Sequence, residues 1–451
     1  MFGTDLFLKY NNYCETKLKH LTHKHHEIVE LIDNLKNHEI FEIEELGKSI
    51  EDRSICCLKA GSGKINVALW SQMHGNEPTA TMALFDVLNF FKSSDEFNSQ
   101  RNEILQNITL HIVPLLNPDG AERFVRENAL GIDLNRDAAR LLSPESQILK
   151  SLIDKTKSDF GFNLHDQSRA FGAAKTSKPA TISFLAPAAN FEKSIDEKRE
   201  KSMKVIVGMG KVVNHFSPGC TGRYSDDFEP RAFGDNIQKW GTCTILIESG
   251  GAINDFKRQY VRKLNFAIVL DALLAIANDS YMTQKTDDYF QIPQNEKNFF
   301  DLLIKNATLI NQEKQYKVDI GVNYHEQQMH DVTMPLRKST IVAIGDLSTM
   351  FGYQELNADG YTIKNGEIYP ETISTPDVIL ANQINYLKKG YISFSTTEFP
   401  GKDKADELLI DLIPDNTLQK NNFAIDEKAN FLLMKNNIVH FVVSNGKLIK
   451  L

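Results

Sequence analysis

The chain has 451 residues, which is long for one hydrophobic core and predicts about two to three domains. Its apolar fraction of 41% and charged fraction of 24% are ordinary for a soluble globular protein. The net charge of −8 argues against a surface built to bind nucleic acid or an anionic membrane.

The N-terminal residues are polar and include no apolar stretch of signal-peptide length, and no segment reaches the roughly 20 apolar residues of a membrane span. The five cysteines are sparse and odd in number, which is not the pattern of a disulfide framework. We therefore expect a cytoplasmic protein. We also expect no large inhibitory prodomain, because the candidate metal-binding stretch described below begins close to the N-terminus.

Strands and helices alternate through the first 285 residues. The runs 54–60 and 64–70, joined by Gly-Ser-Gly, predict a β-hairpin. Further strands are expected at 107–117, 159–166, 181–187 and 242–250, and helices at 26–37, 79–93, 144–157, 197–216 and 258–279. This alternation predicts an α/β domain with a mixed, largely parallel, twisted sheet flanked by helices.

Two further segments carry distinct patterns. The histidine-rich stretch from His20 to His26 predicts a solvated helix face, with a regulatory metal site as the less favoured alternative. From about residue 285 the chain changes to short β-like runs with few helical patterns. We therefore divide it into a domain of residues 1–285 and a mostly-β domain of residues 286–451.

Several strand-like runs of the first domain end in polar clusters, among them HGNE, HDQ and ESGG. Ligands of an open α/β sheet bind outside the carboxyl ends of its strands, so these clusters are expected to meet in one cleft. The cleft would contain His74, Glu77, His165 and Glu248. Two imidazoles and one carboxylate, with a fourth position open, form a catalytic zinc composition. Taken singly, each histidine is more typical of a hydrogen-bonded core residue, and H-x-x-E is a weak motif.

Two arginines belong to the same neighbourhood. Arg126 and Arg136 flank the stretch ENALGIDLN, and a guanidinium presents a planar fork of donors that fits a carboxylate. One arginine could hold a terminal carboxylate of a substrate, and the other could polarise a carbonyl group. For an isolated arginine, an ion pair with Asp133 or Asp137 would be the favoured interpretation.

The motifs HGNE, NPDG, NALGIDLNRD, NLHD and LIESGG occur in the order found in zinc carboxypeptidases of the carboxypeptidase A type. The chain resembles that family from Leu46 to Ile276. The resemblance implies that one Zn²⁺ ion is bound, that Asn117 and Asp119 shape their loop, and that the other motif residues divide into four roles. These are zinc ligands (His74, Glu77, His165), general acid/base (Glu248), carbonyl polarisation (Arg126) and binding of the C-terminal carboxylate (Asn135, Arg136).

The chain departs from the family's pattern upstream of the catalytic glutamate. The only tyrosine between the third metal ligand and that glutamate is Tyr224, a candidate substrate-binding residue that is equally well explained as a surface tyrosine. Arg231 lies where the family forms its side-chain pocket, which would favour acidic C-terminal residues. An ion pair of Arg231 with Asp227 or Asp235 is the preferred interpretation.

The resemblance implies a zinc-dependent metallocarboxypeptidase that hydrolyses the C-terminal peptide bond of peptides. One alternative is a zinc-dependent amide deacylase acting on N-acyl amino acids or cell-wall peptides, and another is a non-catalytic binding module. The expected partner is a peptide or small amide with a free carboxylate; nucleic acid and membranes are not expected, and a homo-oligomer is left open. The C-terminal domain resembles the small β-sandwich of metal-dependent amidohydrolases, without their barrel, and is expected to be an accessory module.

Overall fold

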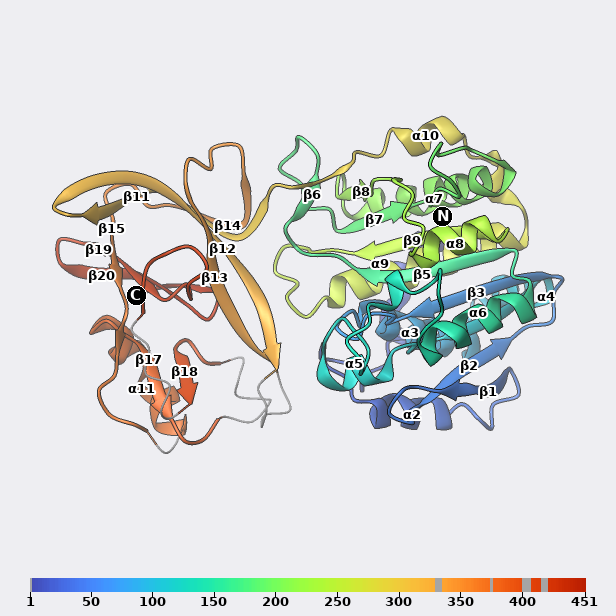
Figure 1. Cartoon of the computed structure of the whole chain (residues 1–451), viewed down its shortest axis with the longest axis horizontal. Helices are drawn as coiled ribbons and strands as arrows, with labels where there is room; N and C mark the ends of the chain where they lie inside the picture. The colour runs from blue at the N-terminus through green and yellow to red at the C-terminus, as the bar shows by residue number, and fades with distance from the viewer. Residues whose placement is uncertain (1, 329–334, 374–375, 400–406, 415–420) are drawn as a thin grey trace. The chain divides into compact units, whose positions relative to one another are not determined.

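The computed structural model describes residues 2–328, 335–373, 376–399, 407–414 and 421–451. These residues form two compact units, Met1–Lys297 and Asn298–Leu451 (Figure 1). The division lies C-terminal to the boundary that we expected at residue 285. Residues 286–297 belong to the first unit because helix α10 (Thr286–Phe290) packs on it and buries Tyr289, whose hydroxyl lies 3.0 Å from the amide nitrogen of Ala186.

The first unit is built on an eight-stranded sheet flanked by helices (Figure 1). In sheet order, the strands are β1 (Phe41–Lys48), β2 (Ser54–Ala60), β4 (Ile108–Val113), β3 (Ile65–Ser71), β5 (Phe160–Asp166), β9 (Cys243–Ser249), β7 (Ile182–Leu185) and β8 (Thr221–Arg223). The four central strands, β4, β3, β5 and β9, run parallel, whereas β1, β2 and β7 pair antiparallel with their neighbours β2, β4 and β9. The predicted mixed, largely parallel sheet is confirmed.

Both faces of the central sheet are buried, as a parallel sheet requires. Along β3, Val67 and Leu69 join one apolar cluster, and Ala68 and Trp70 join another on the opposite face. The helices of this unit are α1 (Phe2–Lys9), α2 (His25–Asp33), α3 (Thr79–Lys92), α4 (Asn98–Asn107), α5 (Pro118–Arg123), α6 (Pro144–Thr156), α7 (Glu197–Phe216), α8 (Phe233–Lys239), α9 (Gln259–Ala277) and α10. Residues of α3, α7 and α9 contribute to the first cluster, and residues of α6 and α8 contribute to the second.

The predicted hairpin of β2 and β3 is wrong, because β4 lies between these two strands in the sheet. The Gly-Ser-Gly connection instead packs against the backbone at Asn107 and Ile108, where β4 begins. A Cβ atom on Gly63 would lie 1.8 Å from the carbonyl carbon of Asn107, and Gly61 has a φ of +81°. The glycines therefore permit a close backbone crossing, and they do not form a two-residue turn between paired strands.

The N-terminal segment is anchored by a buried ion pair between Asp86 of α3 and Arg262 of α9. Both side chains are completely inaccessible, and Arg262 also donates hydrogen bonds to the carbonyl oxygens of Glu15 and Leu18. The predicted solvated histidine face is wrong for His23, which is 3% exposed and precedes helix α2. The histidine stretch supplies no member of the one metal-ligand cluster found in the described residues.

The second unit is mostly β, as predicted. Its strands are β11 (Phe299–Asn311), β12 (Lys314–Gln328), β13 (Pro335–Gly345), β14 (Phe351–Asn357), β15 (Thr362–Asn365), β16 (Glu367–Ile368), β17 (Tyr391–Thr396), β18 (Asp411–Pro414), β19 (Phe431–Lys435), β20 (Ile438–Ser444) and β21 (Lys447–Lys450). Strands β16, β17 and β18 form a separate parallel sheet, and helix α11 (Pro376–Lys388) connects β16 to β17. This helix was not predicted. The similarity of the second unit to the amidohydrolase β-sandwich stays a prediction.

Two features bear on the expected location. All five cysteines are free thiols, which confirms that they do not form a disulfide framework. None of the helices in the described part of the chain has the length and apolar character that crossing a bilayer requires. The cytoplasmic location stays a prediction.

Candidate active site

The carboxyl ends of three adjacent parallel strands bring the candidate residues together. Strand β3 ends at Ser71 and leads into the loop that carries His74 and Glu77, while His165 lies near the end of β5. Glu248 of β9 is the register partner of His165. Because neighbouring residues in register share a face of the sheet, β5 and β9 present an imidazole and a carboxylate side by side.

The two histidines and Glu77 form a compact, buried cluster. The Nδ1 atoms of His74 and His165 lie 3.2 Å apart. Each Nδ1 atom lies 2.8 Å from a different oxygen of the Glu77 carboxylate, namely Oε1 for His74 and Oε2 for His165. These three side chains are the only group in the described residues whose ligand atoms gather closely enough to hold a metal ion.

Asp133 orients the imidazole of His74. Its Oδ1 lies 3.0 Å from Nε2 of His74, and because an ionised carboxylate can only accept, Nε2 carries the proton. In the neutral imidazole, Nδ1 then keeps its lone pair and faces the Glu77 carboxylate. A carboxylate behind a histidine in this way fixes the tautomer that ligates a metal. From sequence we expected Asp133 only as an ion-pair partner of an arginine, so its contact with His74 was not predicted.

The charges of the cluster suit a cation. Burial by itself raises the pKa of Glu77, but the two histidines lower it by more, so the carboxyl group is ionised far below its ordinary range. Burial lowers the pKa of His74, yet Glu77 and Asp133 outweigh it and leave this pKa above its usual value. Two imidazole nitrogens and a carboxylate that converge among buried side chains match the donor set that Zn²⁺ prefers.

Arg126 lies directly beside this cluster. Its Nη1 is 3.2 Å from Oε1 of Glu77, and its Nε donates to Oδ2 of Asp133 at 3.1 Å. Its backbone carbonyl is held by the amide of Gly75 and by the side chain of Asn117, in line with the loop-shaping role predicted for Asn117. The guanidinium is 39% exposed, so it can reach a bound molecule while it remains tied to the cluster.

Glu248 is a carboxylate with spare hydrogen-bonding capacity. Its Oε2 is buried and has no hydrogen-bond partner within the described part of the chain. Burial, followed by the nearby carboxylates of Glu77 and Asp166, raises the pKa of Glu248 well above its ordinary value. A buried carboxyl group with a raised pKa is the kind of side chain that can serve as a general base and then as a general acid.

Asn135 and Arg136 lie on the short 3₁₀ turn Leu134–Arg136. The side-chain oxygen of Asn135 accepts a hydrogen bond from the amide of Phe233, so its Nδ2 group remains as the donor. The guanidinium of Arg136 is 42% exposed, and its Nε lies 3.7 Å from Oε2 of Glu229. The pair therefore presents hydrogen-bond donors.

Arg231 binds a different acid from those predicted. It forms a two-point ion pair with Glu229, at 2.9 and 2.8 Å, and neither of the two expected aspartates takes that place. Asp227 instead pairs with Lys193 at 2.5 Å. The reason is local: Glu229 is two residues from Arg231 in the same turn, and their side chains meet on the exposed surface.

Tyr224 follows strand β8 and is partly buried. Burial, then the charges of Glu248 and Glu77, raise the pKa of its hydroxyl, so the ring lies within electrostatic reach of the cluster. The ring of Phe171 lies 5.5 Å from it. Asn295, whose side-chain amide bonds Gln167 after β5 and Ser183 on β7, was missed from sequence, because it lies in a segment that we assigned to the second domain.

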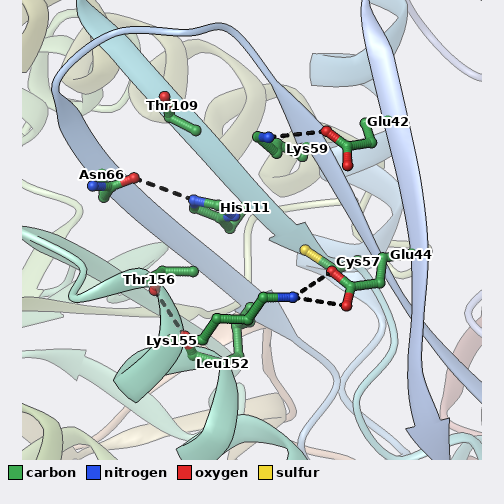
Figure 2. A pocket seen from close by; sticks show the side chains of 10 residues that line it. All are labelled: Glu42, Glu44, Cys57, Lys59, Asn66, Thr109, His111, Leu152, Lys155 and Thr156. Carbon is green, nitrogen blue, oxygen red and sulfur yellow. Dashed lines mark hydrogen bonds and ion pairs between the residues drawn. The ribbon is translucent and has the colours of Figure 1, made fainter.

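A hollow of about 460 Å³ lies on the sheet face formed by β1, β2 and β4, and none of its lining residues belongs to the candidate site (Figure 2). Strand register aligns Glu42, Lys59 and His111 across it. Lys59 pairs with Glu42 at 2.9 Å, and Lys155 pairs with Glu44 at 2.8 Å. The charges of the hollow are thus balanced among its own side chains.

Comparison with known proteins agrees with this geometry. Residues 28–183 match the family described as zinc carboxypeptidase, Peptidase_M14. An uncharacterised protein of Zymomonas mobilis is 35% identical over 27% of this chain and 33% of its own length. Carboxypeptidase 2 of Trichophyton tonsurans is 29% identical over 34% of this chain and 28% of its own length. The chain therefore spans at most about a third of these two relatives.

The solved metallo-carboxypeptidase from Burkholderia cenocepacia is 20% identical, with a TM-score of 0.47 over 58% of this chain and 70% of that one. The predicted resemblance to zinc carboxypeptidases is confirmed by the family match. The matched range includes all three candidate metal ligands, whereas Glu248 lies beyond it.

Proposed function

The chain carries a zinc carboxypeptidase domain, and we propose that this domain is an active metallocarboxypeptidase that binds one Zn²⁺ ion and removes residues from the C-terminus of peptides. The single observation that carries the proposal is the convergence of two Nδ1 atoms and a carboxylate within 3.2 Å of one another. With Nε2 of His74 protonated toward Asp133, Nδ1 of His74 keeps a lone pair that points to the same place as the Glu77 carboxylate, and the guanidinium of Arg126 lies 3.2 Å from both.

His74, Glu77 and His165 would hold the ion. When bound, zinc lowers the pKa of a coordinated water and polarises a carbonyl oxygen. The residues around the cluster divide the remaining work. Glu248, with its buried Oε2, would accept the proton of the attacking water and then deliver it to the departing amine. Arg126 would donate to the oxygen on which negative charge develops, from a guanidinium already oriented by Asp133.

Asn135 and Arg136 would restrict the reaction to the chain terminus. The Asn135 amide is oriented by Phe233 so that it offers donors, and Arg136 offers a partly exposed guanidinium. Together they match the two oxygens of a free C-terminal carboxylate. This selectivity separates an exopeptidase from an enzyme that cleaves internal amide bonds.

The experiment is a substrate panel for the purified, zinc-loaded chain. It compares N-blocked dipeptides with a free carboxylate, the same dipeptides with a C-terminal amide, and N-acyl amino acids. The proposal expects turnover of the free-carboxylate dipeptides and at least a roughly hundredfold lower kcat/KM for the amides, because a charge-assisted, two-point contact is lost. Turnover of N-acyl amino acids alone would assign the site to a deacylase, and zinc binding without any turnover would indicate a binding module.

A further inference from the structure

The backbone pairing between β5 and β9 ends just beyond the two residues that these strands contribute to the candidate site. His165 and Glu248 are register partners, and the pairing extends one residue past them. One further bond joins the amide of Gln167 to the carbonyl of Ser249 at 2.9 Å. The next amide of that segment, on Gly250, donates at 2.8 Å to the residue that precedes β7, on the other side of β9. A link that holds the ends of β5 and β9 together beyond this point has to come from outside the ladder.

The guanidinium of Arg258 supplies such a link. Its Nη1 donates to the carbonyls of Ser249 and Gly250 at 2.7 and 2.9 Å, and its Nη2 donates to the carbonyl of Gln167 at 3.1 Å. One planar group therefore bonds backbone from both strand ends, which the flexible point charge of a lysine does not reproduce. All three residues that carry these carbonyls are buried, so the oxygens depend on donors from within the protein.

The segment around Arg258 is held from several sides. The residue precedes helix α9 and has a φ of +52°, in the left-handed region that a residue with a side chain occupies only where its surroundings hold it there. The carboxylate of Asp255 accepts from the amides of Tyr260 and Val261 at 3.1 and 3.0 Å, which fixes the first turn of the helix. Because α9 packs in the apolar core of the first unit, the guanidinium is anchored on a buried helix and not on a surface loop.

We infer that Arg258 is a positioning residue of the proposed peptidase site: it ties the end of β5 to the end of β9 and thereby sets the spacing between the His165 imidazole and the Glu248 carboxylate. The inference rests on the proposed function and concerns a residue outside the matched family range. Its physical basis is that a reacting group displaced by about 1 Å can lower the rate roughly a hundredfold. The hydrogen bonds of Arg258 go to backbone carbonyls, so it would act through the strands and not on the substrate.

The first test is steady-state kinetics on a free-carboxylate dipeptide with variants of the full, zinc-loaded chain. Arg258→Met removes all three bonds and should lower kcat at least about tenfold, while KM changes less than about threefold. KM is spared because Asn135 and Arg136, which would bind the substrate carboxylate, lie on a different segment. Arg258→Lys keeps the charge but not the fork, so its kcat should fall at least about threefold and lie above that of Arg258→Met.

The matched control is Arg140→Met, the same replacement at an exposed arginine of the same unit, which should leave both constants unchanged. Rates are normalised to the folded fraction measured by circular dichroism, since a merely structural role would lower that fraction and leave the normalised kcat unchanged. Arg258→Lys decides the test if Arg258→Met does not fold. A normalised kcat that falls less than about threefold in the deciding variant would overturn the inference while leaving the proposed function intact.

A readout that needs no turnover separates failure of this inference from failure of the proposed function. Hydrogen–deuterium exchange, followed by mass spectrometry on the metal-free chain, reports on the amides of Gln167 and Gly250 at the strand ends. Both should exchange at least about tenfold faster in Arg258→Met, whereas strand β1 at the far edge of the sheet should keep its native rate, as should the whole chain in Arg140→Met. Unchanged exchange at the strand ends, or an equal acceleration in β1, would refute the inference whatever the activity of the chain. Faster exchange confined to the strand ends, in a protein whose native form hydrolyses no peptide, would support the link that Arg258 makes and count against the proposed function alone.

Discussion

Replacement of Arg262 by methionine tests how the N-terminal segment is attached to the first unit. In the native structure, Nε and Nη2 of Arg262 donate to Asp86 at 2.7 and 2.5 Å, and Nη2 also donates to the carbonyl of Glu15 at 3.0 Å. Methionine keeps much of the volume of the side chain and removes all of its donors. Asp86 is then left as an uncompensated carboxylate in a site with no solvent access.

The cost follows from the burial of the pair. Removing one partner of a buried ion pair destabilises a protein by about 3–5 kcal/mol, and two backbone carbonyls lose their donor here as well. Asp86→Asn should destabilise the protein by a similar amount, because it leaves the Arg262 guanidinium as a buried charge without a carboxylate partner. Because the double variant leaves no unpaired charge, its cost should be smaller than the sum of the two single costs by roughly 2–3 kcal/mol.

The pH dependence has a definite sign. Burial raises the pKa of Asp86 to about 6, even though Arg262 opposes this shift, and the loss of Arg262 raises that pKa further. A carboxyl group whose pKa is higher in the folded state than in the unfolded state loses stability as the pH rises between the two values. The loss of unfolding free energy caused by Arg262→Met should therefore be larger at pH 8 than at pH 5.

Urea unfolding monitored by tryptophan fluorescence measures these effects in the first unit, because both tryptophans of the chain, Trp70 and Trp240, lie there. Trp70 is fully buried, so its emission changes when the core opens. A loss of less than about 1 kcal/mol for Arg262→Met, or costs that simply add in the double variant, would refute this account of the anchor.

Three further predictions concern the site and the N-terminal segment. Arg136→Lys should raise KM for free-carboxylate peptides roughly tenfold at nearly constant kcat, because lysine lacks the planar fork of donors; an unchanged KM in steady-state kinetics would contradict this. Burial lowers the pKa of His23 to about 4, so stability is lost as the pH falls from about 6.5 to 4. The unfolding free energy of His23→Phe minus that of the native chain should then rise by about 3 kcal/mol as the pH falls through that window. A difference that does not change with pH would argue against a neutral buried imidazole. Gly75→Ala places a Cβ atom 2.0 Å from the carbonyl carbon of Gly120, so it should weaken zinc binding at least about tenfold in chelator competition; native affinity would mean that the loop can shift at no cost.

The metal cluster could be predicted from sequence because its members follow strands that the hydrophobic pattern makes evident. His165 and Glu248 close two apolar runs, and the strands that carry them are neighbours in the sheet. The same logic could not predict the order of the outer strands. The glycines between β2 and β3 are typical of a hairpin, and only the packing of Gly63 against Asn107 reveals a crossing.

Residues that act through tertiary contacts left little signal in the sequence. Asp133 follows no strand, and its hydrogen bond to His74 depends on how the loop folds back. Asn295 lies 130 positions beyond His165, in a segment whose composition resembles the following β-rich region. His23 was expected on a solvated face because its neighbours are polar, yet it is buried at the anchor of the N-terminal segment.

The most direct test of the metal-dependent peptidase is to measure zinc content and the hydrolysis of one free-carboxylate dipeptide in parallel, for the native chain and for Glu248→Gln. We expect about one zinc ion per chain in both proteins, and turnover in the native chain that falls at least about a thousandfold in the variant, since the amide cannot accept the proton of water. A native chain that binds no zinc, or a Glu248→Gln variant that hydrolyses the dipeptide at the native rate, would contradict the account.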